Sequence, residues 1–219
     1  MSQEFFNSDM RLFLDTRMDW ERYFKLRRGG DVNVAEEVET YRSILQTLGD
    51  ICVEIAAAAR DHWHEEVKVV DGRVVTPPHI AAGYEKLRKA GLVCLPIDTE
   101  YNGYGLPLLF NIFYLEAIAR ADSSLMTIVG LQTGVASDIE KYGSDELKKQ
   151  YLPRFTSGEL QGCMDLTEPQ AGSDLGGIVT RMTEENGRFF LDGEKIFITN
   201  GGAQVHLVLA RDAKSYEKS

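Results

Sequence analysis

Apolar residues recur every three or four positions through most of the first 158 residues, which is the period of an α-helix. The longest such run, residues 34–64, contains a stretch of alanines and predicts a long helix that forms part of a core. A shorter amphipathic run at residues 9–24 predicts a helix or an arm that packs on something larger. Further helices are expected at residues 80–90, 110–121, 125–142 and from residue 144 to Pro153.

Glycine, asparagine and proline mark the breaks between these runs. Residues 27–31 interrupt the first amphipathic run, and a small strand or turn around an Asp-Gly pair is expected at residues 69–75. Gly91 comes directly after a predicted helix, at the position where glycine commonly ends one. Residues 101–107 are rich in glycine, asparagine and proline, so we expect a loop there.

The pattern changes after Gly158. Short β-branched and aromatic runs then alternate with turn sequences, among them Asn-Gly at 186–187 and Asp-Gly at 192–193, which are strong hairpin signals. We therefore expect an antiparallel meander or partial barrel that begins near Gln161. Its strands are expected at residues 178–182, 189–191, 196–199 and 205–210.

A run of helices followed by a run of strands predicts two domains of different class. We expect an N-terminal arm at residues 1–33, an all-α helical bundle domain at 34–160, and an incomplete antiparallel β-barrel-like domain at 161–219. A ligand site is expected where the two domains meet. The chain ends soon after the last predicted strand, which would leave an open sheet edge, so we expect it to be a fragment.

Charge and hydropathy exclude several classes of partner. The formal net charge is −10 and the pI is about 4.9, which argues against a nucleic acid or an anionic membrane because both need a basic face. No apolar run approaches the roughly 20 residues that span a bilayer, and the first residues lack the basic region of a secretory signal. We expect an intracellular protein with no membrane span.

Cysteine and histidine spacing gives no sign of a metal site. Cys52, Cys94 and Cys163 are odd in number and widely spaced, and they form no CxxC pair. His62 and His64 are two apart on a predicted helix, so they face different directions. From the sequence we expect neither a disulfide framework nor a bound metal.

Residues 166–177, with the sequence LTEPQAGSDLGG, have the composition of a ligand cradle. A glycine at Gly172 would permit a positive φ and close approach of the backbone to a ligand. Ser173 and Asp174 can cap or turn the chain locally. Taken alone, the stretch fits an ordinary surface turn better than a site.

Residues 194–202, with the sequence EKIFITNGG, form a second cluster. If this segment is a strand, Phe197 and Thr199 share a face and place an aromatic plane beside a hydroxyl donor. That pairing suits a flat heteroaromatic ligand such as an isoalloxazine ring. Alone, the pair fits an ordinary core phenylalanine and an exposed strand threonine better.

Together the two clusters resemble the acyl-CoA dehydrogenase family. Residues 166–177 resemble its flavin-binding signature, and residues 193–201 resemble its second flavin segment. The resemblance extends from about Val34 to the C-terminus. It also includes residues 103–105, 142–143, 148–153 and 157–159, while residues 71–77 and 205–211 are similar to a larger bacterial subgroup with an extended N-terminus.

The resemblance implies FAD as cofactor and gives individual residues a role. Thr167 would donate to the edge of the flavin ring, Phe197 would stack beside it, and Thr199 would hydrogen-bond near N5. Ser173 would contact the cofactor phosphates and the pantetheine arm of the substrate. The cofactor-binding residues implied in this way are Met164, Leu166, Thr167, Gly172, Ser173, Phe197, Ile198 and Thr199.

Asp165 departs from the family pattern, which has a small or apolar residue at this position. Strand alternation from Met164 and Leu166 would point its carboxylate away from the flavin. If it pointed toward the ring instead, a buried carboxylate would disfavour the anionic reduced flavin.

The activity implied by the resemblance is the α,β-dehydrogenation of an acyl-CoA thioester to a trans-2-enoyl-CoA. Electrons would pass to electron-transfer flavoprotein, and the catalytic base would come from a C-terminal helical domain that is absent from this chain. Two alternatives are a non-catalytic flavin- or CoA-binding subunit that needs a partner chain, and an acyl-CoA oxidase. Family precedent implies a homodimer or homotetramer in the bacterial cytoplasm, in preference to a mitochondrial matrix.

Overall fold

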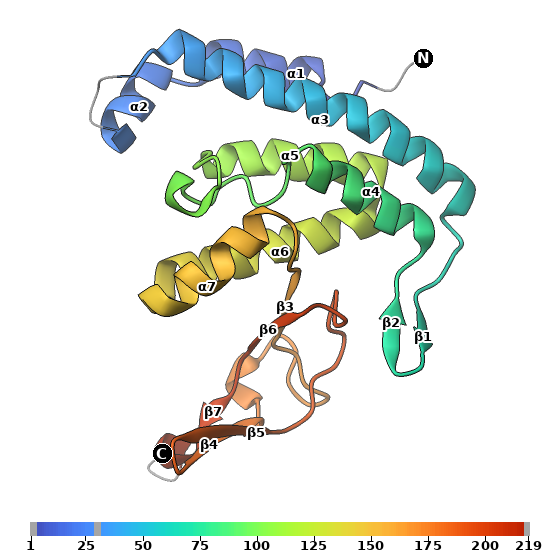
Figure 1. The fold of residues 1–219 in the computed structure, drawn as a ribbon, viewed down its shortest axis with the longest axis vertical. Coiled ribbons are helices and arrows are strands. Elements are labelled where there is room, and N and C mark those ends of the chain that lie inside the picture. Colours follow the sequence, from blue (N-terminus) through green and yellow to red (C-terminus); the bar gives the residue numbers. More distant parts are fainter. Residues whose placement is uncertain (1–3, 29–31, 217–219) are drawn as a thin grey trace.

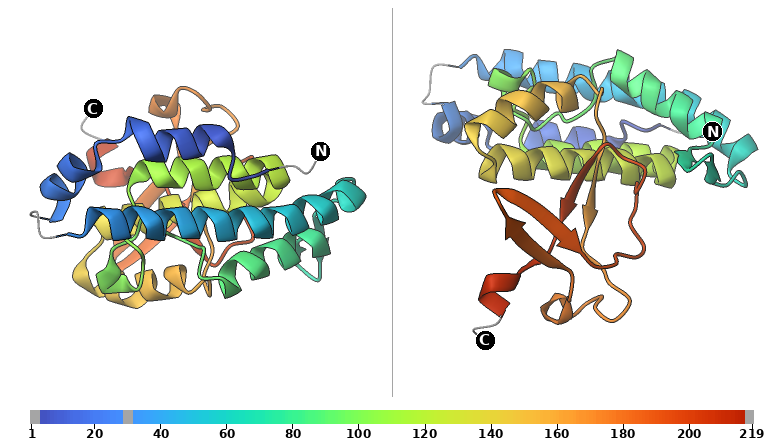
Figure 2. Two further views of the ribbon diagram at one scale, coloured as in Figure 1. Left: turned by 90° about the horizontal axis from the view of Figure 1, so that it is seen from above. Right: turned by 60° about the horizontal axis from the view of Figure 1, so that its bottom comes forward.

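A helical part and a smaller β part make up the chain (Figure 1). The computed structural model describes residues 4–28 and 32–216. The β part lies on one side of the helical layers, next to α6 (Ser123–Tyr142), as the rotated views in Figure 2 also show. The predicted order of a helical domain followed by a partial β domain is therefore confirmed, and the described strands do not close into a barrel.

The N-terminal segment packs on the helical core. It contains α1 (Ser8–Leu12), a π-helical turn at Phe13–Arg17 and α2 (Trp20–Arg28). Trp20 is buried against Tyr41, and its indole N–H donates to the Leu14 carbonyl oxygen at 2.7 Å. The predicted arm thus contributes to the same hydrophobic cluster as the long helix. Residues 1–3 and 29–31 of that arm lie outside the described residues.

Five longer helices form the rest of this part. The long run predicted at 34–64 is α3, which begins after the Asn33 cap and ends at His62. The helix predicted from residue 144 is α7, which continues through Pro153 to Thr156, so the predicted helix end at Pro153 was wrong. The five helices are α3 (Val34–His62), α4 (Pro78–Lys89), α5 (Leu108–Ala121), α6 (Ser123–Tyr142) and α7 (Asp145–Thr156), and a 3₁₀ turn lies at Thr99–Tyr101.

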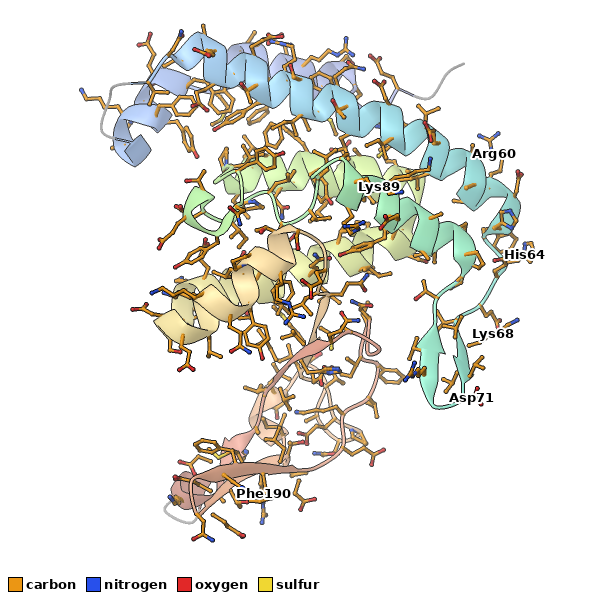
Figure 3. All side chains as sticks on the ribbon, in the orientation of Figure 1. Arg60, His64, Lys68, Asp71, Lys89 and Phe190 are labelled. Carbon is orange, nitrogen blue, oxygen red and sulfur yellow. The ribbon has the colours of Figure 1, made fainter. Side chains whose placement is uncertain are left out.

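A β-hairpin projects from the helical part toward the β part. Strands β1 (Lys68–Val70) and β2 (Arg73–Val75) pair antiparallel, and Asp71, labelled at the hairpin tip in Figure 3, has a positive φ together with Gly72. Two such residues are what a two-residue hairpin turn needs. The strand or turn expected at 69–75 is confirmed.

The strands of the β part pair in both senses. Parallel pairing joins β3 (Gly162–Asp165) to β6 (Val205–Val208) and β4 (Arg181–Glu185) to β7 (Arg211–Asp212). Only β4 and β5 (Arg188–Asp192) make the predicted antiparallel hairpin, around Asn186 and Gly187. The expectation of a purely antiparallel meander was therefore wrong. A 3₁₀ turn at Leu175–Gly177 and a short helix α8 (Ala213–Tyr216) complete the part.

Two strand predictions also need correction. The strand expected at 178–182 begins only at Arg181, and residues 196–199 form no strand. The Asp-Gly pair at 192–193 makes no hairpin. Gly193 instead passes so close to Thr180 that a Cβ at Gly193 would lie 2.3 Å from the threonine hydroxyl. The glycine here allows two segments to cross at contact distance.

Strand β5 exposes apolar side chains to solvent. Phe190 lies at the end of the β part farthest from the helical part (Figure 3) and is 48% exposed. Among the described residues, no helix is both long and apolar enough to cross a membrane.

The helical core sets the stability of the larger part. Leu48 is 0% exposed on α3, whereas Leu26 on α2 is 79% exposed. We expect Leu48→Ala to lower the free energy of unfolding by about 2–5 kcal/mol, through lost transfer energy and a residual cavity. The matched change Leu26→Ala should stay within about 0.5 kcal/mol. Urea unfolding followed by far-UV circular dichroism measures both, and equal effects would contradict the assignment of the core.

Candidate functional site

The two sequence clusters, although about 30 residues apart, lie side by side. The Ile196 N–H donates to the Thr167 carbonyl oxygen at 3.0 Å. One residue earlier, the Lys195 ammonium donates to the Leu166 carbonyl oxygen at 2.9 Å. The residues that precede Phe197 are thereby fixed to the start of the 166–177 loop.

Glu168 is the most connected side chain in this region. It is 2% exposed, and its carboxylate accepts from Lys195 at 2.8 Å and from the Val179 and Thr180 N–H groups at 2.6 and 3.1 Å. Gln170 donates to it as well, at 2.7 Å. Burial acts to raise the pKa of Glu168, but the hydrogen bonds from Lys195, Thr180 and Val179 outweigh it and hold the pKa well below its usual range. The carboxylate therefore stays ionised and holds the loop in place.

The loop itself closes on a reciprocal pair of backbone hydrogen bonds. Glu168 N–H donates to the Ala171 carbonyl oxygen at 2.9 Å, and Ala171 N–H donates back at 3.0 Å. Gly172 and Ser173 follow and are exposed. Within the described part of the chain their backbone N–H groups have no hydrogen-bond acceptor, and such N–H groups are suited to binding an anion.

Gly172 does not adopt the positive φ that a glycine would permit. A Cβ there would meet nothing within 4 Å, so the chain itself does not require glycine at this position. The glycine leaves the backbone uncovered on its open side. That space suits the close approach of a ligand, which is the other reason for which glycine was predicted to matter.

Phe197 is held in an unusual conformation. It has φ of 57°, a left-handed value that is rare for an aromatic residue, and its side chain is 89% exposed. Because residues 196–199 form no strand, the prediction that strand alternation aligns Phe197 with Thr199 was wrong. The Asn200-Gly201-Gly202 turn bends the chain here, and Asn200 donates to the Gly162 carbonyl oxygen at 3.3 Å.

A cavity of about 530 Å³ opens beside this turn, between the β1–β2 hairpin, α6 and residues 198–202. Ile198 and Thr199 line it from the β part. Gly202 passes so close to the hairpin that a Cβ there would lie 2.7 Å from the Val74 Cβ, so only glycine fits. The other lining residues are Glu65, Val67, Val74, Thr76, Pro77, Ile80, Ser124, Thr127, Ile128, Asn200, Gly201 and Gly202.

Met164 and Asp165 point to opposite faces of β3. The Met164 methyl group lies against α6, where it would be 3.1 Å from a Cβ on Gly134. Asp165, which is 9% exposed, instead contacts Cys163 and His206. The carboxylate therefore lies on the face away from Met164, the outcome that strand alternation predicted.

The structure brings the predicted residues together only in part. Leu166 and Thr167 adjoin residues 195–196, and Ile198 and Thr199 reach the cavity. Neither Gly172 nor Ser173 lines that cavity. Sequence reasoning missed the pairing of Glu168 with Lys195, whose signal was an acid in one cluster and the single base in the other. It also missed the part that Val74 and Gly202 play in shaping the cavity.

Comparison with known proteins gives the relationships of the chain. Residues 39–159 match the acyl-CoA dehydrogenase N-terminal domain family and residues 163–219 match the middle domain family. Over 182 residues the chain is 34% identical to the 3-methylmercaptopropionyl-CoA dehydrogenase of Ruegeria pomeroyi, covering 80% of this chain and 31% of that protein. The chain thus spans about a third of the length of this relative.

Solved structures agree. Butyryl-CoA dehydrogenase from Megasphaera elsdenii aligns with a TM-score of 0.66 at 26% identity, over 78% of this chain and 43% of that one. A structure described as the electron transferring flavoprotein of Acidaminococcus fermentans aligns with a TM-score of 0.64 at 28% identity, over 78% of this chain and 44% of that one. A glutaryl-CoA dehydrogenase from Mycobacterium smegmatis in complex with FADH2 aligns with a TM-score of 0.56 at 26% identity, over 77% of this chain and 44% of that one. The chain therefore belongs to the acyl-CoA dehydrogenase family.

Proposed function

We propose that the protein carrying this chain oxidises the Cα–Cβ bond of an acyl-CoA thioester to a trans-2-enoyl thioester, with FAD as the electron acceptor. The observation that carries this proposal is that the two clusters are hydrogen-bonded to each other at Thr167 and Ile196, while Ile198 and Thr199 of the second cluster line a partly apolar cavity. The relatives that are acyl-CoA dehydrogenases, and the neighbour that holds FADH2, support the same reading.

The residues present fit a flavin. Phe197 offers an exposed ring to a flat ligand, and Gly172 and Ser173 offer uncovered N–H groups to its phosphates. When bound, FAD would accept the hydride from the substrate β-carbon. We propose that Met164, Leu166, Thr167, Phe197, Ile198 and Thr199 hold the ring, that Gly172 and Ser173 face the phosphates, and that Ser173 also contacts the pantetheine arm.

The cavity suits the acyl chain of the substrate. Its wall includes the aliphatic side chains of Val67, Val74, Ile80 and Ile128, which can bury a chain of methylene groups. Thr199 is part of the same wall. A substrate bound here would place its reacting carbons between the helical part and the second cluster.

The reaction needs a proton acceptor close to the substrate, and the family resemblance implies that it is a carboxylate. One carboxylate of the described residues, Glu65, lines the cavity, but its hydrogen bond with His62 at 2.8 Å lowers its pKa and makes it a weak base. We therefore propose that the base comes from residues beyond position 219. Thr199 and its neighbours would position the substrate for that base.

The wider assignments are part of the same proposal. We place the arm at residues 1–33, the helical domain at 34–160 and the middle domain at 161–219. Electrons would leave through electron-transfer flavoprotein, in keeping with the flavoprotein structure among the neighbours. The assembly would be a homodimer or homotetramer in the bacterial cytoplasm.

Removal of the Thr199 hydroxyl tests the proposed chemistry. In the protein expressed from its own reading frame, including whatever follows residue 219, we expect Thr199→Val to retain bound flavin but to lower kcat for acyl-CoA oxidation by about 100-fold. Anaerobic bleaching of the flavin by butyryl-CoA measures this. Thr47→Val, an exposed α3 position, should leave the rate unchanged. Failure of any acyl-CoA to bleach the wild-type protein would contradict the proposal, and rapid oxygen consumption would favour the oxidase.

The exposed ring of Phe197 gives a second test. Because the ring is 89% exposed, Phe197→Ala should change the free energy of unfolding by less than about 0.5 kcal/mol. We expect it to weaken FAD binding by about fivefold, since ring stacking contributes about 1 kcal/mol. Flavin fluorescence titration measures the affinity. The matched change Phe190→Ala on β5 should leave it unaltered, and equal affinities for all three proteins would rule out Phe197 as a stacking partner.

Glu168 generates a prediction about pH. Since its folded pKa lies well below the unfolded value of about 4.3, its stabilisation is complete above that pH and is lost as the pH falls through the folded pKa. Glu168→Gln should therefore lower Tm at pH 7, and the difference in Tm between the variant and wild type should become smaller below about pH 4.3. Thermal scans across this range measure it. The surface change Glu184→Gln, next to Lys214, serves as the control, and a difference in Tm independent of pH would exclude an ionised Glu168 as the cause.

A further inference from the structure

A compact cluster of Cys163, Asp165 and His206 lies on one face of the β3–β6 pair. The parallel register places Cys163 opposite His206, and Asp165 shares their face because it is two residues farther along β3. Cys163 Sγ lies 3.1 Å from His206 Nδ1 and 3.2 Å from Asp165 Oδ1. His206 Nδ1 lies 2.8 Å from Asp165 Oδ2, so three potential ligand atoms converge on one point.

The hydrogen bonding of His206 identifies which ring nitrogen is available. Nε2 lies 3.1 Å from the Ala203 carbonyl oxygen, which can only accept, so Nε2 carries a proton. Nδ1 then has a lone pair unless the ring is protonated, and it faces a carboxylate oxygen that also accepts. Two acceptors at 2.8 Å need a cation between them, which is either a proton or a metal ion.

We propose that Cys163, Asp165 and His206 form a site for a zinc-class divalent cation. A thiolate, a carboxylate and a neutral imidazole are all ligands that Zn²⁺ takes, and their combined charge of −2 balances it. The contact of Nε2 with a backbone carbonyl is the outer interaction that orients a metal-binding histidine. Binding would release two protons, one from the Cys163 thiol and one from between His206 and Asp165.

The geometry needs only a small adjustment. Tetrahedral bond lengths place ligand atoms about 3.4 to 3.6 Å apart, so the triangle must expand by roughly half an ångström. Cys163 is fully buried and Asp165 is 9% exposed, whereas the His206 side chain is 37% exposed. The exposed side gives the ion an entry path and leaves a fourth position for water.

The cluster is separate from the proposed flavin site and does not fit a catalytic thiol. Met164 and Asp165 point to opposite faces of β3, so the ion would lie on the face away from α6. Burial, and then Asp165, raise the pKa of the Cys163 thiol to about 12, which makes it a poor nucleophile in the absence of a cation.

Cobalt titration of the metal-free protein, expressed from its own reading frame, tests the proposal. Co²⁺ is the probe because a cysteine thiolate gives it a near-ultraviolet charge-transfer band and a tetrahedral site gives it visible bands. We expect wild type to bind one Co²⁺ per chain with both signals, and Zn²⁺ to displace it. Cys163→Ala and His206→Gln should each weaken binding by at least about 100-fold.

Cys52→Ala provides the matched control, because Cys52 is also a buried free cysteine but lies on α3. It should bind Co²⁺ like wild type. His206 is exposed, so His206→Gln should fold normally, and far-UV circular dichroism checks this. Absence of stoichiometric Co²⁺ binding by wild type, or a charge-transfer band that persists in Cys163→Ala, would overturn the proposal and leave the cluster as a hydrogen-bonded network.

Discussion

The buried ion pair between Glu168 and Lys195 is the interaction on which the candidate site depends. Both side chains are almost inaccessible, and together they bind backbone groups at Leu166 and at Val179–Thr180, so the pair connects these two segments to the one that carries Lys195. A carboxylate removed from water is costly unless its hydrogen bonds are satisfied, and here four donors satisfy it. Because the pair connects loops rather than strands, it gives an irregular region one defined arrangement.

The helical part supplies the rigid surface against which those loops are placed. Its core is continuous from the N-terminal segment to α6, and α6 contacts β3 along the junction. Gly162 packs against Val135 on α6, where a Cβ would come within 2.8 Å. Gly202 makes a similar approach to Val74 of the hairpin. Two glycines thus allow the β part to meet the helical part closely at two places, on α6 and on the hairpin.

The sequence predicted local structure well wherever a period or a turn signal was decisive. The helix at 34–62, the hairpin around Asp71 and the hairpin around Asn186 all follow from such signals. Strand partners could not be predicted, because parallel pairing of β3 with β6 joins residues about 40 apart. The convergence of Cys163, Asp165 and His206 depends on that register. The left-handed conformation of Phe197 could not be predicted either. Residues 196–199 have the sequence pattern of a strand, but the turn that follows prevents a strand from forming.

The conformation of Phe197 carries one more physical implication. A left-handed φ at a bulky residue costs of order 1–3 kcal/mol, and full exposure of the ring gains nothing from burial to offset it. The hydrogen bonds at Ile196 and Asn200, on either side of it, hold the backbone in this state. Such strain persists where the surroundings impose it, and it places the ring in the open before any ligand arrives. A backbone fixed in this way loses little entropy on binding, which is the advantage of a preorganised site.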